Sequence, residues 1–485
     1  MERNKPKNVI SQKEASSENK KVHVVMLPWL AFGHMIPFLD LSIALAKSGI
    51  HVSFLSTPKN IQRLPKIPPN LSELIDFVPL SLPKLDPNYL LPENAEATVD
   101  IPADNMEYLK IAYDLLREPI KKFIAKKSPN WIIVDFFPHW AVDIAQELNI
   151  PIITNYITTA STAVFFWTPE FLIGDKGQKQ ARPLPKDLTV PPDWVNFPSQ
   201  VACRNNHEAI NMHSVLFSKT QLGSQMARLA RLVEGSQAVA IRTCLEFEGD
   251  YLKLYSEITG KTVFPLGFFP PEKLKERRII KEEQWSKIFD WLDEQKPRSV
   301  VFVGFGSEYK LKKEEIHEIA YGVELSGLPF LWALRKPDWA NSEDIEVLPT
   351  GFVSRTAGRG VVQIGWAPQR DILGHRSIGG SLFHAGWASI IETMIYGHCL
   401  VLLPFVIAQP LDTRLLVEKG LAVEVDRAED GSFNRDDIAN SLRKAMVSEE
   451  GETIRARVKE AADGIFGNEK LNDDYINKFV EYLRN

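Results

Sequence analysis

A histidine stands at the end of the first apolar run of the chain. The run "VHVVML" (22–27) leads into the turn "PWLAFGH", which ends at His34, and a helix is predicted over 37–47. Turns that join a buried strand to a helix commonly carry functional residues. Because the imidazole ring titrates close to neutral pH, His34 is the first candidate for proton-transfer chemistry.

A second set of candidate residues lies in the segment "GSLFHAGWASIIETMIYG". An apolar strand ends there in a short turn with Gly386, and a helix follows. The free N–H groups at a helix start, with His384 and Ser389 beside them, suit a diphosphate. Ser307, in the turn after "VVFVGFG", can contribute from a facing turn. The alternatives are that His384 is structural and that Ser389 is only a helix N-cap.

Several common nucleotide and catalytic motifs are missing. Neither "PWLAFGH" nor "VGFGSE" contains G-x-G-x-x-G, which argues against a nicotinamide-dependent oxidoreductase. The sequence also has no P-loop, no H-E-x-x-H and no G-x-S-x-G. We therefore expect no metal and no resident cofactor.

The elements that must position these residues alternate between apolar strands and amphipathic helices in both halves of the chain. That alternation predicts an α/β fold of two Rossmann-like, doubly wound domains with ligands at the strand ends between them. The charged stretch after "FFPP" reads as a linker. The predicted division is a disordered tail (1–21), an N-terminal domain (22–265), the linker (266–284), a C-terminal domain (285–466) and a terminal helix (467–485).

Length and composition limit the class of protein. With 485 residues, the chain is long enough for two domains. A net charge of −5 gives no basic footprint for nucleic acid, and no apolar run is long enough to span a membrane. The three cysteines are widely separated and suggest a reducing compartment, so we expect a cytoplasmic protein. We also expect a monomer.

One long segment resembles a known signature. The 44 residues from Trp366 to Gln409, "WAPQRDILGHRSIGGSLFHAGWASIIETMIYGHCLVLLPFVIAQ", resemble the box of plant UDP-sugar-dependent glycosyltransferases. The segments "PWLAFGHMIPF", "VVFVGFGS" and "IRTCLEFEGDYL" are similar to the same family, and the first of them resembles the subgroup that extends a sugar already attached to an acceptor. This resemblance implies the GT-B fold and a C-terminal helix that returns to the first domain.

The resemblance also implies a catalytic pair. His34 matches the family's general base, which takes the proton of an acceptor hydroxyl. Asp135, at the end of "WIIVDFF", matches the acid that orients the imidazole. His139 and Asp143 are nearby alternatives for that role, but neither matches a motif.

The donor residues carry over one by one. Trp366 would stack on uracil while the backbone of Ala367 pairs with it, and Gln369 and Glu392 would hold the ribose hydroxyls. The remaining positions would contact the diphosphate or the transferred sugar, and they are Ser307, His384, Gly386, Trp387, Ala388, Ser389, Ala408 and Gln409.

Two of these positions, and the neighbouring Ala385, depart from the family pattern. Ala385 replaces a cysteine, and Ala388 replaces a side chain that donates to phosphate. Ala408 replaces an acid that accepts hydrogen bonds from the donor sugar, which leaves the donor's identity open. Asp412, in place of an asparagine, is a candidate to compensate.

The resemblance predicts an inverting transferase that moves a sugar, glucose, from a UDP-sugar to a small lipophilic acceptor, namely a sugar hydroxyl of a flavonoid or terpenoid glycoside. The alternatives are a UDP-rhamnose-dependent transferase and a weakly active nucleotide-sugar binding protein. The variable segments 60–120 and 158–225 would shape the acceptor pocket. Its apolar walls would come from Phe32, Phe136, Phe137, Phe165, Phe166 and Trp167.

Overall fold

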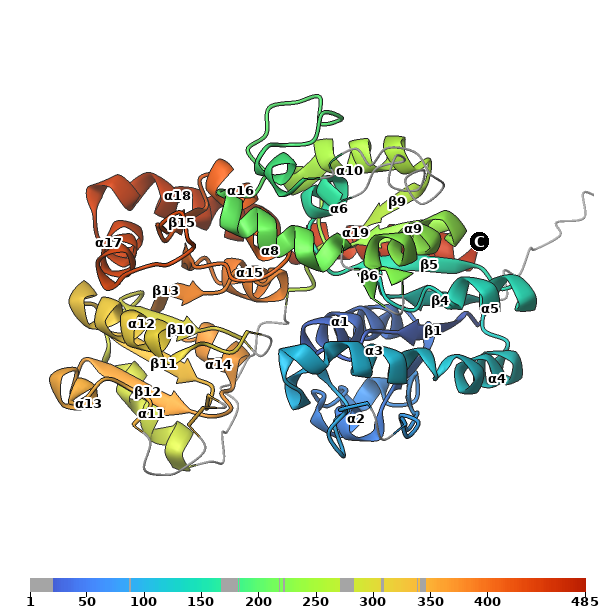
Figure 1. Cartoon of the computed structure of the whole chain (residues 1–485), viewed down its shortest axis with the longest axis horizontal. Helices are drawn as coiled ribbons and strands as arrows, with labels where there is room; N and C mark the ends of the chain where they lie inside the picture. The colour runs from blue at the N-terminus through green and yellow to red at the C-terminus, as the bar shows by residue number, and fades with distance from the viewer. Residues whose placement is uncertain are drawn as a thin grey trace, which may run out of the picture.

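The chain folds into two α/β domains that lie side by side (Figure 1). The structure is a computed structural model that describes residues 21–86, 89–166, 182, 184–217, 219–220, 223–270, 283–306, 309–337, 339–340 and 346–485. The predicted N-terminal tail lies outside these residues except for Lys21, as do most of the predicted linker, Ser307 and Trp167.

The first domain is built on a seven-stranded parallel sheet in the order β3-β2-β1-β4-β5-β8-β9. The strands are β1 (His23–Leu27), β2 (His51–Ser56), β3 (Ile75–Pro79), β4 (Trp131–Val134), β5 (Ile152–Tyr156), β8 (Ala238–Ile241) and β9 (Thr262–Pro265). Helices cover both faces, so the central strands are continuous runs of buried apolar residues.

The second domain is built on a six-stranded parallel sheet in the order β12-β11-β10-β13-β14-β15. Its strands are β10 (Val300–Gly304), β11 (Phe330–Leu334), β12 (Gly360–Ile364), β13 (Ile378–Phe383), β14 (Cys399–Leu402) and β15 (Ala422–Glu424). In chain order this is the 3-2-1-4-5-6 arrangement of a doubly wound sheet, and the first six strands of the other sheet repeat it. The predicted fold class is confirmed.

The helices alternate with the strands. In the first domain they are α1 (Phe32–Lys47), α2 (Pro58–Arg63), α3 (Met106–Asp114), α4 (Arg117–Lys127), α5 (Ala141–Leu148), α6 (Ala160–Phe166), α8 (Asn206–Phe217), α9 (Gln225–Gly235) and α10 (Leu245–Thr259). In the second they are α11 (Glu283–Glu294), α12 (Lys313–Ser326), α13 (Phe352–Arg355), α14 (Gln369–Leu373), α15 (Trp387–Ile395), α16 (Gln409–Glu418), α17 (Arg435–Met446) and α18 (Glu452–Ala461).

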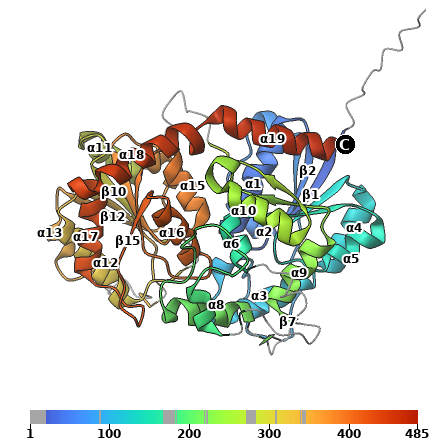
Figure 2. The same cartoon turned by 90° about the horizontal axis from the view of Figure 1, so that it is seen from above.

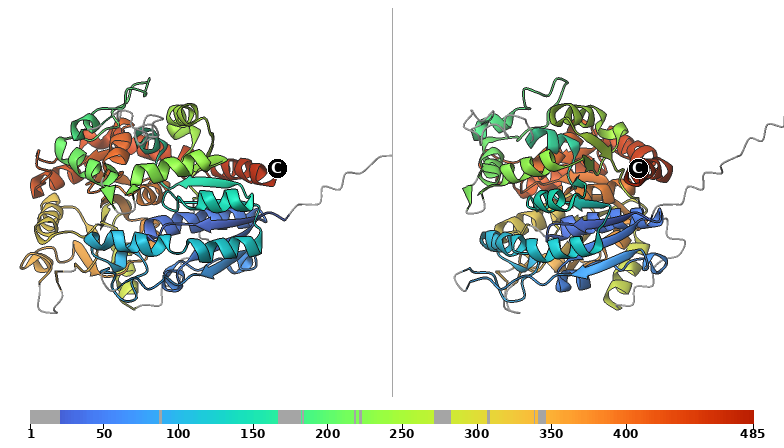
Figure 3. Two further views of the ribbon diagram at one scale, coloured as in Figure 1. Left: turned by 45° about the vertical axis from the view of Figure 1, so that its right-hand side comes forward. Right: turned by 90° about the vertical axis from the view of Figure 1, so that its right-hand side faces the viewer.

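The last helix, α19 (Glu469–Arg484), lies against the first domain (Figures 2 and 3). Tyr475, Phe479 and Leu483 repeat every four residues along one face, and all three are buried. Phe479 and Leu483 pack in the same apolar cluster as Val24 and Phe38 of the first domain.

The two domains share an apolar core. One cluster contains Phe247 and Tyr251 of α10 together with Trp387, Leu411 and Leu415 of the second domain. Because this cluster spans both domains, it fixes the strand ends of one sheet relative to those of the other.

Two predicted boundaries differ from the structure. The helix predicted from residue 37 begins at Phe32, because the N–H groups of His34 and Met35 already bond to the carbonyl oxygen of Ala31. Pro37 lies in the second turn, where its missing N–H leaves one intrahelical hydrogen bond unformed. Helix α11 begins at Glu283 and so includes the last two residues of the predicted linker. None of the helices in the described residues is long and apolar enough to cross a lipid bilayer.

Candidate active site

His34 and Asp135 meet at the carboxyl edge of the first sheet. Strands β1 and β4 are parallel neighbours, with Leu27 beside Val134, so the turns after them begin at the same edge. His34 Nδ1 lies 2.7 Å from Asp135 Oδ2. The carboxylate is 1% exposed, whereas the imidazole is 20% exposed. The pair therefore has a buried acid and a ring that reaches solvent.

The carboxylate of Asp135 is held by three donors. Its Oδ2 also accepts from the backbone N–H of Trp29 at 2.9 Å, and its Oδ1 accepts from the N–H of Phe136 at 2.7 Å. Since a carboxylate only accepts, His34 Nδ1 must carry the proton, which leaves Nε2 to receive one from a substrate. Asp143, an alternative acid from the sequence, pairs instead with arginines, including Arg231.

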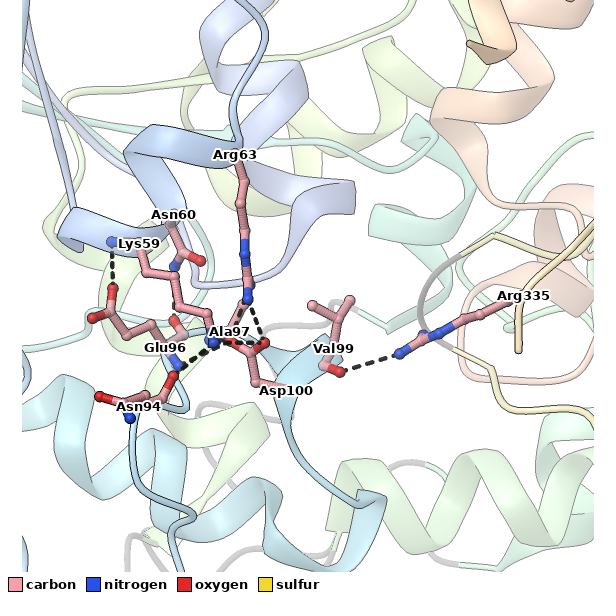
Figure 4. Close-up of polar contacts among 9 residues, drawn as sticks. All are labelled: Lys59, Asn60, Arg63, Asn94, Glu96, Ala97, Val99, Asp100 and Arg335. Atoms are coloured by element: carbon pink, nitrogen blue, oxygen red, sulfur yellow. Dashed lines mark hydrogen bonds and ion pairs between the residues drawn. The ribbon is translucent and has the colours of Figure 1, made fainter. Parts of the chain in front are cut away.

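A segment without any sequence motif supports the turn that carries His34. The N–H of Thr98 donates to the carbonyl oxygen of Leu30 at 3.0 Å. Asp100, at the end of the 3₁₀ turn η2 (Thr98–Asp100), binds Arg63 and Lys59 of α2 (Figure 4). Burial raises the pKa of Asp100, but hydrogen bonds from Arg63, the backbone N–H of Glu96 and Lys59 outweigh it and lower the pKa to about 2.

The same segment also touches the second domain. Arg335, just after β11, donates to the carbonyl oxygen of Val99 at 3.1 Å (Figure 4). Lys310 reaches the carbonyl oxygen of Ile101 at 3.4 Å. These contacts fix residues 98–101 between α2, the turn with His34 and the other domain.

His384 directly follows β13, as Asp135 directly follows the corresponding strand β4 of the first sheet. Strands β10 and β13 are parallel neighbours, with Gly304 beside Phe383. A Cβ on Gly306 would lie 2.5 Å from His384 Cε1, and one on Gly386 would lie 2.7 Å from Nε2, so only glycine leaves room for the ring at both positions. The predicted facing turns therefore do meet, although Ser307 itself is outside the described residues.

Burial makes the imidazole of His384 a neutral group. The residue is 6% exposed, and burial lowers its pKa to about 4. Within the described residues its buried Nδ1 has no hydrogen-bond partner. A buried nitrogen without a partner is costly, and an anionic ligand at the adjacent helix start would satisfy it.

Helix α15 begins directly after this turn. Its N-cap is Gly386 and not Ser389, so the N-cap alternative for that serine is wrong. The indole of Trp387 is buried and donates to the carbonyl oxygen of Arg242 at 2.9 Å, so the side chain has no donor left for a ligand. Ala388 and Ser389 are half-buried. The backbone of Ala385 has a φ of 65°, a left-handed conformation that alanine rarely adopts and that the sequence therefore does not predict.

The predicted nucleotide residues lie together between β12 and α15. Trp366 follows β12 and is 72% exposed, and the half-buried Ala367 comes next. Gln369 opens α14, and its Nε2 donates to Glu392 Oε2 at 2.9 Å. An exposed indole can stack on a base, and a carboxylate fixed by Gln369 can accept hydrogen bonds from sugar hydroxyls.

Replacing Trp366 by alanine should weaken UDP binding by about 1–3 kcal/mol, because a stacking surface for the base is lost. The thermal unfolding midpoint should stay unchanged, since the side chain is mostly exposed. Calorimetric titration with UDP measures the effect, and Val353→Ala, at another exposed apolar residue of this domain, is the control. Wild-type affinity in Trp366→Ala would remove this residue from the base site.

The loop before α16 holds the residues predicted to meet the sugar. Gln409 Oε1 accepts from the N–H groups of Phe405 at 2.9 Å and Val406 at 3.1 Å, so its Nε2 is the group left to donate. Ala408 is the N-cap of α16 and is half-buried. Its neighbour Ile407 has a φ of 43°, which is strained for a β-branched residue.

The structure does not support Asp412 as a substitute for the missing acid. Its carboxylate is 1% exposed, and Oδ1 accepts from Thr159 at 2.8 Å and Thr162 at 3.0 Å, both in or next to α6 of the other domain. Position 412 lies one turn beyond Ala408, where the side chain points into the domain interface. Burial, with a smaller contribution from the nearby Glu248, raises the pKa of Asp412 to about 8, against the effect of the two threonine hydrogen bonds.

Asp412 should make the protein less stable as pH rises. Its pKa is higher in the folded state than in the unfolded state, so its contribution is complete below about pH 4 and is lost as pH rises to about 8. The loss is at most about 1.4 kcal/mol for each pH unit in this window. Asp412→Asn should flatten this dependence and raise the unfolding midpoint at pH 8, measured by calorimetry from pH 5 to 8. Parallel curves for the two proteins would contradict the assignment.

The aromatic residues expected to line an acceptor pocket divide into two groups. Phe137 and Phe165 are 1% and 2% exposed and belong to the core, so the prediction is wrong for them. Phe32, Phe136 and Phe166 are half-buried. The ring of Phe136 lies 5.2 Å from that of His34 and is the apolar surface next to the base.

Comparison with known proteins identifies the family to which both halves of the chain are similar. The family described as UDP-glucoronosyl and UDP-glucosyl transferase matches residues 281–452, and that described as glycosyltransferase, N-terminal domain, matches residues 20–222. UDP-glycosyltransferase 91C1 of Arabidopsis thaliana is 40% identical over 96% of both chains. Soyasaponin III rhamnosyltransferase of Glycine max is 39% identical over 96% of both chains.

A solved structure agrees in fold along the whole chain. A transferase from Siraitia grosvenorii in complex with UDP has a TM-score of 0.72 and 25% identity, and the match covers 96% of this chain and 100% of that one. With a paired His34 and Asp135 on one domain and the signature residues assembled on the other, the chain belongs to the plant UDP-glycosyltransferase family, and it is an enzyme.

Proposed function

We propose that this enzyme transfers glucose from UDP-glucose, with inversion, to a sugar hydroxyl of a flavonoid or terpenoid glycoside. The observation that carries the proposal is the His34–Asp135 pair, because binding of a nucleotide sugar alone needs neither residue. Soyasaponin III rhamnosyltransferase, a relative named for sugar transfer to a saponin, supports a glycosylated acceptor.

The reaction begins with the acceptor hydroxyl against His34 Nε2. The imidazole takes the proton, and the hydroxyl oxygen attacks C1 of the sugar on the face opposite UDP. The C1–O bond to the diphosphate breaks, and its electron pair leaves with UDP. Asp135, bonded to Nδ1, stabilises the imidazolium that forms. Attack from the opposite face inverts the configuration at C1.

The second domain holds the donor in this proposal. Trp366 and Ala367 bind uracil, and Gln369 and Glu392 bind the ribose. The diphosphate lies at the start of α15, against the N–H groups of Trp387, Ala388 and Ser389 and the ring of His384. Ser307, which lies outside the described residues, is a further predicted contact. These donors and the helix dipole stabilise the leaving diphosphate without a metal, so EDTA should leave the rate unchanged.

The direct test incubates the protein with UDP-glucose or UDP-rhamnose and a panel of aglycones and their glycosides, with product masses and NMR as readouts. The expected product is a glycoside extended by one hexose with an inverted anomeric bond. Products formed only from aglycones would overturn the acceptor class, and retained configuration would overturn the mechanism. UDP-rhamnose is the second candidate donor, favoured by the rhamnosyltransferase relative and by the alanine at position 408.

Ala408→Asp should lower the KM for UDP-glucose or raise glucose transfer. An acid there would accept hydrogen bonds from the sugar, each worth about 1.5–3 kcal/mol to a charged group. Affinity for UDP itself should change little. Kinetics with UDP-glucose and UDP-rhamnose in both proteins provide the test, and melting curves separate this effect from helix capping, since position 408 is the N-cap of α16. Unchanged or poorer glucose transfer would mean that other residues recognise the donor sugar.

A further inference from the structure

An ion pair joins the helix that carries the base to the donor domain. Asp40 lies on α1, six residues after His34, and Arg370 lies on α14 next to Gln369. The guanidinium of Arg370 donates through one nitrogen to Asp40 Oδ1 at 3.2 Å and Oδ2 at 3.0 Å. The pair therefore crosses the boundary between the domains, on whose two sides α1 and α15 lie (Figure 2).

The other end of the same guanidinium holds a donor residue. Arg370 Nε donates to Glu392 Oε1 at 2.8 Å, while Gln369 donates to Oε2 at 2.9 Å. Each carboxylate oxygen keeps a second lone pair, so Glu392 can still accept from two ribose hydroxyls. One arginine thus contacts both the base helix and the carboxylate proposed to bind ribose.

A buried arginine of the first domain, Arg242, connects Asp40 to the donor domain by a second route. Arg242 donates to Asp40 Oδ2 at 3.4 Å and to the carbonyl oxygen of Phe268 at 3.1 Å. The carbonyl oxygen of Arg242 accepts from the indole of Trp387, at the start of α15. Helix α15 is therefore bonded to the first domain directly through Trp387, and indirectly at Glu392 through Arg370 and Asp40.

Partial burial distinguishes this pair from an ordinary surface salt bridge. The side chains of Asp40 and Arg242 are 13% and 5% exposed, and that of Arg370 is 45% exposed. The carboxylates of Asp40 and then Glu392 raise the pKa of Arg370, so the arginine stays charged. A planar guanidinium fixed by two carboxylates has a defined orientation, which a lysine in its place would not have.

We propose that Asp40 and Arg370 are positioning residues for sugar transfer, which couple the ribose-binding carboxylate to the helix that carries the base. This inference rests on the proposed function. The pair holds the bound donor and His34 at a fixed separation, and it acts on the chemical step more than on nucleotide affinity. A small displacement of reacting groups is enough to slow a reaction strongly.

The test compares Asp40→Asn and Asp40→Glu with the wild type in kcat, in KM for UDP-glucose and in UDP affinity by calorimetry. Asp40→Asn should lower kcat about tenfold and change KM and UDP affinity less than twofold, because Glu392 keeps both of its donors. Asp40→Glu keeps the charge and should restore part of kcat. In an Arg370→Gln background, Asp40→Asn should cause a much smaller further loss of kcat, since only the bond from Arg242 is left to lose.

Glu324→Gln is the matched control. Arg355 binds Glu324 through Nε at 2.7 Å and a second nitrogen at 2.9 Å, within the second domain, so its loss should leave kcat unchanged. Unchanged kcat in Asp40→Asn would overturn the inference. A loss that Asp40→Glu does not relieve and that follows the unfolding midpoint would also overturn it, as a purely structural effect. A wild-type protein that transfers no sugar would instead contradict the proposed function.

Discussion

His34→Ala should lower kcat by about 100-fold or more at neutral pH, because the acceptor hydroxyl loses its general base. The hydroxyl is a poor nucleophile while it keeps its proton, and His34 Nε2 is the basic atom that the paired ring presents. The affinity for UDP should hardly change, since the signature residues for the nucleotide lie on the other domain. Steady-state kinetics and calorimetric titration with UDP measure the two effects.

The chain offers a matched control for this variant. His51 lies 3.5 Å from Asp76, so it also forms a His–Asp pair, but at the amino ends of β2 and β3. His51→Ala should leave kcat unchanged, because that edge of the sheet is opposite the candidate site. Full activity of His34→Ala at neutral pH would remove His34 from the catalytic role.

Asp135→Asn should also lower kcat by about 100-fold or more, while UDP affinity stays unchanged. The amide can place either an oxygen or an NH₂ group toward His34. An NH₂ group there would donate to Nδ1, so the ring proton would move to Nε2, which then could not accept from the substrate. The pH dependence of kcat should change with it, since no carboxylate stabilises the imidazolium.

The buried bonds of Asp135 add a second expectation. Its oxygens accept from three donors, and an amide nitrogen cannot accept, so at least one donor loses its partner at a cost of about 1–3 kcal/mol of stability. Asp76→Asn is the control, because Asp76 stands beside the control histidine and is half exposed. A rate and pH profile equal to those of the wild type would assign the role to another group.

Sequence and structure agree most closely where a residue type and its neighbours decide the outcome locally. The apolar runs that end before His34 and at Gly304 are buried parallel strands, as their composition predicts. The edge strands β3 and β15, with the sequences "IDFVP" and "AVE", lack a long apolar run, so composition alone does not indicate them. The prediction that Phe137 and Phe165 line the acceptor pocket is wrong, because the sequence around an aromatic residue near a strand end does not distinguish a core position from a pocket wall.

What the sequence by itself determined is the chemistry available: an imidazole after one strand, an acid after another, and a box of 44 residues that resembles a nucleotide-sugar site. Only the tertiary structure decided which of these groups meet. His34 and Asp135 are 101 residues apart and bond because β1 and β4 are neighbours at the point where the strand order reverses. Three further features depend on side chains from separate strands and domains. They are the pairing of Arg370 with Asp40, the burial of Asp412, and the His384 Nδ1 that has no hydrogen-bond partner among the described residues. No local pattern specifies these contacts, because packing brings together groups that are distant in the chain.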